Sequence, residues 1–112
     1  MSSLNFNGGN TSTRKIPAVS GSHGKVLYAL CRYGRQTARE LVLLTGYCGA
    51  QERANELLNK YYLPIIKGSR LVKMETGREV YVTTYGLDRD FINSSVLRDF
   101  KVRARRHYGD LD

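Results

Sequence analysis

Hydrophobic residues recur at helical spacing in three consecutive stretches of this chain, after which the spacing becomes that of strands. Between Ser22 and Gly34, apolar side chains repeat every three or four residues, which predicts a helix capped by Ser22 and ended by Gly34. Thr37 and Glu40 then have the spacing of a capping box, which predicts that a second helix begins there. Gly46 supplies the positive φ that a sharp exit from this helix requires.

A third helix is expected from about Ala50 to Lys60. At 100° per residue its apolar side consists of Ala50, Ala54, Leu57 and Tyr61. Its outward polar side consists of Glu52, Asn55, Glu56 and Asn59, flanked by Gln51, Arg53 and Lys60. The small alanines allow close packing against the second helix. The segment Thr45-Gly46-Tyr47 therefore joins two helices into a tight pair.

Beyond this helix pair the pattern is that of extended chain. Pro64 excludes a helix around it, because proline pushes the preceding residue out of the helical region. Residues 71–75 and 79–83 are rich in strand-forming side chains and flank Thr76-Gly77-Arg78. This arrangement predicts a β-hairpin with Gly77 at its turn.

The last predicted element is a helix capped by Asp88 and running to about Arg106. Its apolar stripe consists of Ile92, Val96, Leu97 and Phe100, followed by Ala104. Such a stripe either completes the core of its own chain or forms the interface of a homodimer.

Residues 1–21 are rich in Ser, Asn, Gly and Thr and contain no acidic residue. Because they cannot bury enough apolar surface to offset the entropy of ordering, we expect a flexible N-terminal arm. The predicted organisation is thus an arm over 1–21, one domain over 22–87 and a C-terminal helix over 88–112.

Composition favours a polyanionic partner. The 112 residues include 18 Lys and Arg against 10 Asp and Glu, so the net charge is +8 and nucleic acid is the default partner. No apolar run suits a membrane span or a signal peptide, which predicts a cytoplasmic protein, nucleoid-associated or in the host cytoplasm if phage-encoded. Cys31 and Cys48 are expected to be buried reduced thiols. We find no grouping typical of catalysis, metal or cofactor binding, and expect no enzyme.

Four motifs carry a resemblance to a known superfamily. They are Thr37-Ala38-Arg39-Glu40-Leu41, Thr45-Gly46-Tyr47, Ala54 with Leu57 and Leu58, and the stretch from Leu63-Pro64-Ile65 to Val80-Tyr81-Val82. Their order resembles the winged helix-turn-helix superfamily, and Leu-Pro-Ile is similar to the start of the wing in small bacterial and temperate-phage regulators. The resemblance implies an α+β fold with a three-helix core, a hairpin wing and an extra C-terminal helix. It also implies a transcriptional regulator that binds specific sites on double-stranded DNA.

The resemblance implies roles for particular side chains. The third helix would enter the major groove, with base-reading contacts from Gln51, Arg53 and Asn55. The wing and the helix ends would contact the DNA backbone or the minor groove through Arg35, Arg39, Asn59, Lys60, Lys67, Arg70, Lys73 and Arg78. The dimer alternative assigns its interface to Ile92, Val96, Leu97 and Phe100.

Two glutamates leave other functions open. Glu52 and Glu56 are predicted near the outward centre of the third helix, where a carboxylate repels phosphate unless it accepts from a cytosine amino group. They favour an alternative in which the same fold binds a protein, such as a repressor or a polymerase subunit. A further alternative is an excisionase-like architectural factor, which shares the DNA surface but bends the duplex.

Overall fold

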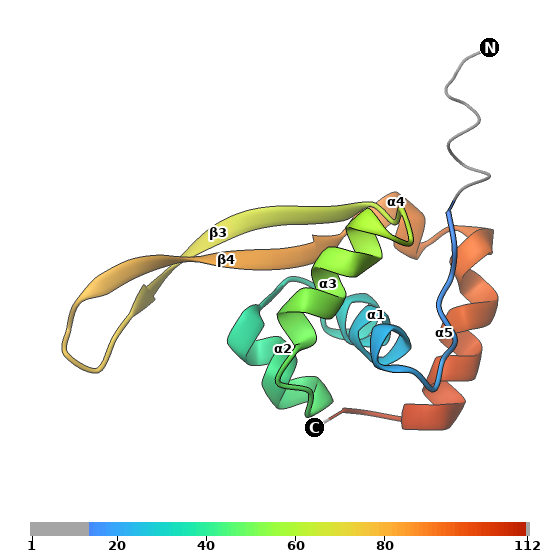
Figure 1. The fold of residues 1–112 in the computed structure, drawn as a ribbon, viewed down its shortest axis with the longest axis horizontal. Coiled ribbons are helices and arrows are strands. Elements are labelled where there is room, and N and C mark those ends of the chain that lie inside the picture. Colours follow the sequence, from blue (N-terminus) through green and yellow to red (C-terminus); the bar gives the residue numbers. More distant parts are fainter. Residues whose placement is uncertain (1–13, 112) are drawn as a thin grey trace, which may run out of the picture.

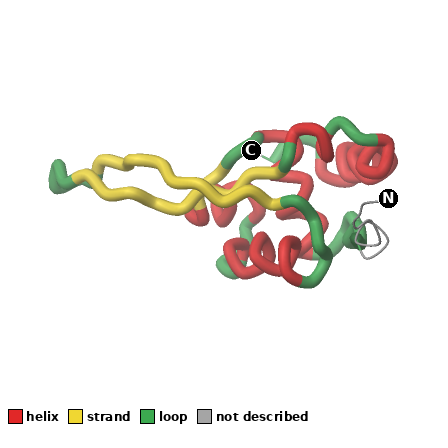
Figure 2. Tube along the Cα trace, turned by 90° about the horizontal axis from the view of Figure 1, so that it is seen from above, coloured by secondary structure: helices red, strands yellow, loops and turns green. Residues whose placement is uncertain are grey.

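The computed structural model describes residues 14–111. Its elements in chain order are α1 (Ser22–Tyr33), β2 (Gln36–Thr37), α2 (Ala38–Thr45), α3 (Ala50–Asn59), β3 (Ile65–Lys73), β4 (Glu79–Leu87), α4 (Arg89–Ile92) and α5 (Ser95–Tyr108). The helices gather at one end of the molecule, and the β3–β4 hairpin projects from them in both views (Figures 1 and 2). The predicted α+β class is therefore confirmed.

Within the described residues, the sheet has three antiparallel strands in the order β2-β4-β3. The sequence did not indicate β2, which is only two residues long and pairs Gln36 with Tyr85 and Thr37 with Thr84. This short pairing ties the start of α2 to the base of the hairpin. The arrangement of three helices and a hairpin is compatible with a winged-helix fold.

The predicted capping box is present at the start of α2. The Thr37 amide donates to Glu40 Oε1 (2.8 Å), and the Glu40 amide donates to Thr37 Oγ1 (3.2 Å). Gly46 ends the helix with φ 78°, in the left-handed region that favours glycine. Its amide donates to the Val42 carbonyl (2.7 Å), so the chain reverses before α3 as the sequence predicted.

The core forms where α1 meets α2, α3, β4 and α5. Leu27, Leu41, Leu57 and Leu97 are each 0% exposed. Figure 1 shows α1 between α2 and α3 on one side and α5 on the other. The predicted apolar side of the third helix is confirmed for Ala50, Ala54 and Leu57, which are buried, whereas Tyr61 lies beyond the end of α3 and is half-buried.

One prediction about α1 was wrong. Gly21, not Ser22, occupies the N-cap position, and Ser22 is the first helical residue. The Ser22 hydroxyl instead accepts a hydrogen bond from Nε of Arg53 on α3 (3.1 Å). This contact links residues far apart in the sequence, so local capping rules gave no sign of it.

The hairpin is longer than predicted, because β3 and β4 pair continuously from Ile65 with Leu87 to Lys73 with Glu79. The extended stretch after Pro64 is thus the first part of the hairpin. Gly77 lies in the turn with φ 87°, as predicted. The amide of Met74 closes the turn by donating to the Arg78 carbonyl (2.7 Å).

The single C-terminal helix predicted from Asp88 to Arg106 is wrong, because the chain breaks after α4. Asp88 does cap α4 by accepting from the Phe91 amide (3.1 Å). Ser94 then adopts extended geometry, and its hydroxyl donates to the Phe91 carbonyl (2.7 Å). Serine competes in this way with the helical backbone, so α5 begins in a new register.

Part of the predicted N-terminal arm packs against the domain. Residues 1–13 lie outside the described part of the chain, but Ile16 and Val19 contact the core. The Lys15 amide donates to the Tyr61 carbonyl (2.9 Å). A Cβ at Gly24 would lie 2.0 Å from the Ala18 carbonyl oxygen, so glycine allows this segment to approach α1 closely. The packed domain therefore begins before Ser22.

Candidate nucleic-acid interface

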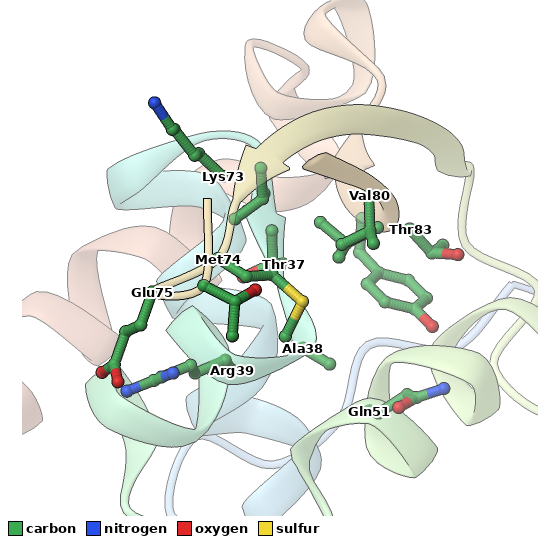
Figure 3. A pocket seen from close by; sticks show the side chains of 13 residues that line it. Thr37, Ala38, Arg39, Gln51, Lys73, Met74, Glu75, Val80 and Thr83 are labelled. Atoms are coloured by element: carbon green, nitrogen blue, oxygen red, sulfur yellow. The ribbon is translucent and has the colours of Figure 1, made fainter. Parts of the chain in front are cut away.

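A groove of about 750 Å³ separates the hairpin from the amino ends of α2 and α3. We call it the wing groove; its walls include Ala38 and Arg39 of α2, Gln51 of α3, and Val72, Lys73 and Val80 of the hairpin. Figure 3 shows Gln51 facing it from one helix and Arg39 from the other. The capping box and the β2–β4 pairing position the amino end of α2 beside the hairpin.

The three predicted base-reading residues do not share one surface. Gln51 is exposed at the first turn of α3 and lines the wing groove. Arg53 is directed toward α1, where it donates to Ser22 and, through Nη1, to Glu56 Oε1 (2.9 Å). The Oδ1 atom of Asn55 is buried without a hydrogen-bond partner in the described part of the chain. Grouping Arg53 and Asn55 with Gln51 as base contacts therefore does not fit the structure.

Glu56 also differs from its prediction as an outward residue. Its carboxylate accepts from His23 Nε2 (2.7 Å), Lys60 Nζ (3.1 Å) and Arg53 Nη1 (2.9 Å). These bonds, that from His23 first, lower the pKa of Glu56 to about 2. Because three donors hold this carboxylate against α1, an acidic pair with exposed Glu52 is not presented to a partner. The outward pair of Glu52 and Glu56, on which the protein-binding alternative was based, is therefore not formed.

Two of the predicted backbone-contacting cations have carboxylate partners. Arg70 Nη1 donates to Oε1 and Oε2 of Glu40 (3.0 Å each), joining β3 to α2. Lys60 is paired with Glu56 at the end of α3. Asn59 is exposed beside Lys60. Arg70 is therefore better described as a positioning residue for the hairpin than as an open phosphate contact.

The other predicted cations are open to solvent. No carboxylate of the described chain lies within ion-pair distance of Arg35, Arg39, Lys67, Lys73 or Arg78, all of which are exposed. Arg35 extends beside Gly68 and Gly86, and Lys67 Nζ lies 5.8 Å from the Tyr85 ring centroid. These five side chains give the hairpin and the start of α2 a positive field.

The tip of the hairpin also carries negative charge. Glu75 lines the wing groove, and Figure 3 shows the side chains of Arg39 and Glu75 extending toward one another. The Lys73 ammonium points away from the groove in the same view. An anion entering beside Arg39 therefore meets Glu75 as a competitor. This approach could not be predicted from local sequence patterns, since it depends on the curvature of the hairpin (Figure 1).

The proposed dimer stripe is divided between core and surface. Leu97 is 0% exposed and Phe100 is 1% exposed, so both complete the core of their own chain and are not available to a second subunit. Ile92 is half-buried, whereas Val96 is 61% exposed. The break at Ser94 explains the difference, because it rotates residues after it relative to a continuous helix.

The cysteine prediction is only half correct. Both thiols are free, and Cys31 is half-buried between α1 and α5. Burial raises the pKa of Cys31 to about 12, against a smaller opposing effect of the Lys101 charge. Cys48 lies exposed in the turn between α2 and α3, contrary to the expectation of burial.

Comparison with protein-family models, curated proteins and solved structures finds no match for this chain. Between residues 14 and 111, no group of three or more His, Cys, Asp or Glu side chains is placed to hold a metal ion. In the same part of the chain, none of the helices has the length and apolar character needed to cross a bilayer.

Proposed function

We propose that this chain is a winged helix-turn-helix protein that binds double-stranded DNA, in the manner of a prokaryotic or phage transcriptional regulator. The observation that carries the proposal is the wing groove, where Gln51 on α3 and Arg39 on α2 face the space beside the hairpin and Lys73 lines its edge with the ammonium directed outward (Figure 3). A base-edge contact and two phosphate contacts are thus available along one surface.

Specificity comes from the first turn of α3. Gln51 and Glu52 are both exposed there. Glutamine pairs with the N6 and N7 atoms of adenine, and a glutamate accepts from the cytosine N4 amino group. Glu52 thus becomes a base contact rather than a source of repulsion. Arg53, whose guanidinium is bound by Ser22 and Glu56, and Asn55, whose Oδ1 is buried, do not read bases.

Affinity comes from the open cations around the groove. Arg35, Arg39, Lys67, Lys73 and Arg78 meet phosphates on either side of the major groove. Contacts of this kind orient the protein and release counterions, so binding weakens steeply as salt rises. The net charge of +8 accelerates encounter with DNA.

The proposal is tested by selecting bound fragments from random duplex DNA and titrating a selected duplex at about 50 and 200 mM salt. We expect a steep loss of affinity between the two salt concentrations. The double variant Arg39→Gln/Lys73→Gln should bind at least about tenfold more weakly at low salt, with a slope shallower by about two phosphate contacts.

The matched control is Arg89→Gln/Arg103→Gln, which removes the same charge from α4 and α5. This control should retain the affinity of the native protein for the selected duplex. Failure to recover any duplex at low salt contradicts the proposal. Equal losses in both double variants would show that net charge alone, and not the wing groove, is responsible.

A further inference from the structure

A second cluster of cations lies on α5. This helix packs against α1 through Leu97, Phe100 and Ala104, all buried. Its exposed cations include Arg98, Arg105 and Arg106, and none of these three lies within ion-pair distance of a described carboxylate. The acid of the same helix, Asp99, is paired with Arg103 at 3.0 Å. Positive charge on this helix is therefore not neutralised locally.

The three arginines share one side of α5. Arg98 and Arg105 are seven residues apart, which places them on one line with a separation of about 10 Å along the axis. Arg106, the next residue after Arg105, is rotated from that line by no more than about 100° around the helix axis. Phosphates along a DNA strand can meet such a row of guanidinium groups.

The positive surface continues across the junction with α1. A hollow of about 290 Å³ between the two helices is lined by Arg32, Lys101, Val102 and Arg105. Lys101 donates to the Ile92 carbonyl (2.6 Å), and Arg32 donates to Asp110 (3.1 Å). We call Arg32, Arg98, Lys101, Arg105 and Arg106 together the α1–α5 basic face.

This face is separate from the wing groove. Figure 1 shows α5 and the hairpin on opposite sides of the helical body, with α1 between α5 and α2. The element contacts agree, since α5 packs on α1 and α4, whereas α1 packs on α2 and α3. A short duplex seated against α3 and the wing therefore leaves the α1–α5 basic face open.

We infer that the α1–α5 basic face binds the phosphate backbone of a second DNA duplex, so that one molecule bridges two DNA segments. The inference rests on the proposed function, because the first duplex occupies the wing groove. Arginine-rich surfaces bind phosphate without needing apolar area. An acidic protein partner is less well matched, because stable protein interfaces contain an apolar core and the exposed apolar side chain in this face is Val102, 47% exposed.

The test mixes two short duplexes, each about one and a half helical turns long and carrying a different fluorophore, with the intact protein at low salt. Energy transfer between the duplexes reports bridging, and titration with one duplex reports the number bound per chain. The native protein should bind two duplexes and give transfer. Arg98→Gln/Arg105→Gln/Arg106→Gln should bind one duplex, lose the transfer, and keep its affinity for a selected sequence.

Two further variants separate this inference from the proposed function. Arg39→Gln/Lys73→Gln, which weakens binding at the wing groove at least about tenfold, should fill that site only at higher duplex concentration and still bind one duplex through the α1–α5 basic face. Arg89→Gln/Arg103→Gln should bridge like the native protein. Circular dichroism of each variant verifies that it is folded.

The outcomes are distinguishable. If the native protein binds one duplex and the triple variant binds it with the same affinity, the second DNA site is overturned. The proposal that the wing groove binds DNA is then retained. A native protein that binds one duplex and loses it in the triple variant contradicts both the wing groove and the bridging of two duplexes, because its single DNA site is then the α1–α5 basic face. Binding of an acidic peptide but of no duplex contradicts both.

Discussion

Nη1 of Arg70 lies 3.0 Å from both carboxylate oxygens of Glu40, so one ion pair joins the hairpin to the first turn of α2. The same carboxylate accepts from the Thr37 amide and completes the capping box. The Thr37 bond, and then the Arg70 contact, lower the pKa of Glu40. Glu40 therefore couples the start of α2 to the position of the hairpin.

Glu40→Ala should destabilise the fold more than Arg70→Ala. Loss of Glu40 removes a capping interaction worth about 1 kcal/mol together with the wing contact. Loss of Arg70 removes only a pair that is two-fifths exposed, worth less than about 1 kcal/mol after solvent screening. Urea denaturation of both variants measures the difference. A larger loss in Arg70→Ala would contradict the dual role of Glu40.

Leu57→Ala should lower the free energy of unfolding by about 2 to 5 kcal/mol, because this side chain is 0% exposed and its removal leaves a cavity. Leu43→Ala is the control, since Leu43 is 73% exposed on α2. Thermal and urea unfolding measure both. Similar stabilities for the two variants would show that the apolar side of α3 is assigned wrongly.

Stability should depend on pH through Glu56. Because hydrogen bonds lower its pKa from 4.5 to about 2 in the fold, ionised Glu56 stabilises the native state above about pH 4.5. This contribution is lost as the pH falls toward about 2. Melting temperatures of the native protein and Glu56→Gln should therefore differ near neutral pH and converge in acid.

Glu52→Gln provides the control for Glu56, because Glu52 is exposed on the same helix and makes none of the ion pairs found among residues 14–111. Its melting temperature should follow that of the native protein across the same pH range. If the melting temperature of Glu56→Gln also follows that of the native protein across this pH range, the three donors bound to the Glu56 carboxylate do not stabilise the fold.

Elements encoded by neighbouring residues could be predicted from the sequence. The capping box needs only Thr37 and Glu40, and the exit from α2 needs only Gly46. The apolar side of α3 followed from helical periodicity, as the burial of Leu57 confirms. In each case the interaction that fixes the structure lies within one or two helical turns, so the residue order carries the information.

Contacts between distant segments could not be predicted in this way. β2 exists because Gln36 and Thr37 pair with β4, and two residues leave no periodicity to detect. Similarly, Arg53 and Glu56 are directed to α1 by Ser22 and His23, more than thirty positions earlier. A helical wheel gives the angle of a side chain but not the identity of the element it faces.

Gln51→Ala and Arg53→Ala should affect DNA binding differently. Gln51→Ala removes a base contact worth about 1 to 3 kcal/mol of discrimination, so it should weaken binding to a selected duplex and leave binding to random DNA nearly unchanged. Arg53→Ala should weaken binding to both duplexes alike, since the guanidinium is bound by Ser22 and Glu56. Fluorescence anisotropy measures the four affinities. If Arg53→Ala weakens binding to the selected duplex but not to random DNA, Arg53 is a base contact after all.

The most direct test of the central claim is to follow the backbone amide resonances of isotopically labelled protein by nuclear magnetic resonance while a selected duplex is added. If the wing groove is the DNA surface, the largest shifts should occur at Arg39, Gln51 and Lys73, with smaller shifts through the rest of the hairpin. If the amide resonances of these three residues do not shift although the duplex is bound, the wing groove is not the DNA-binding surface.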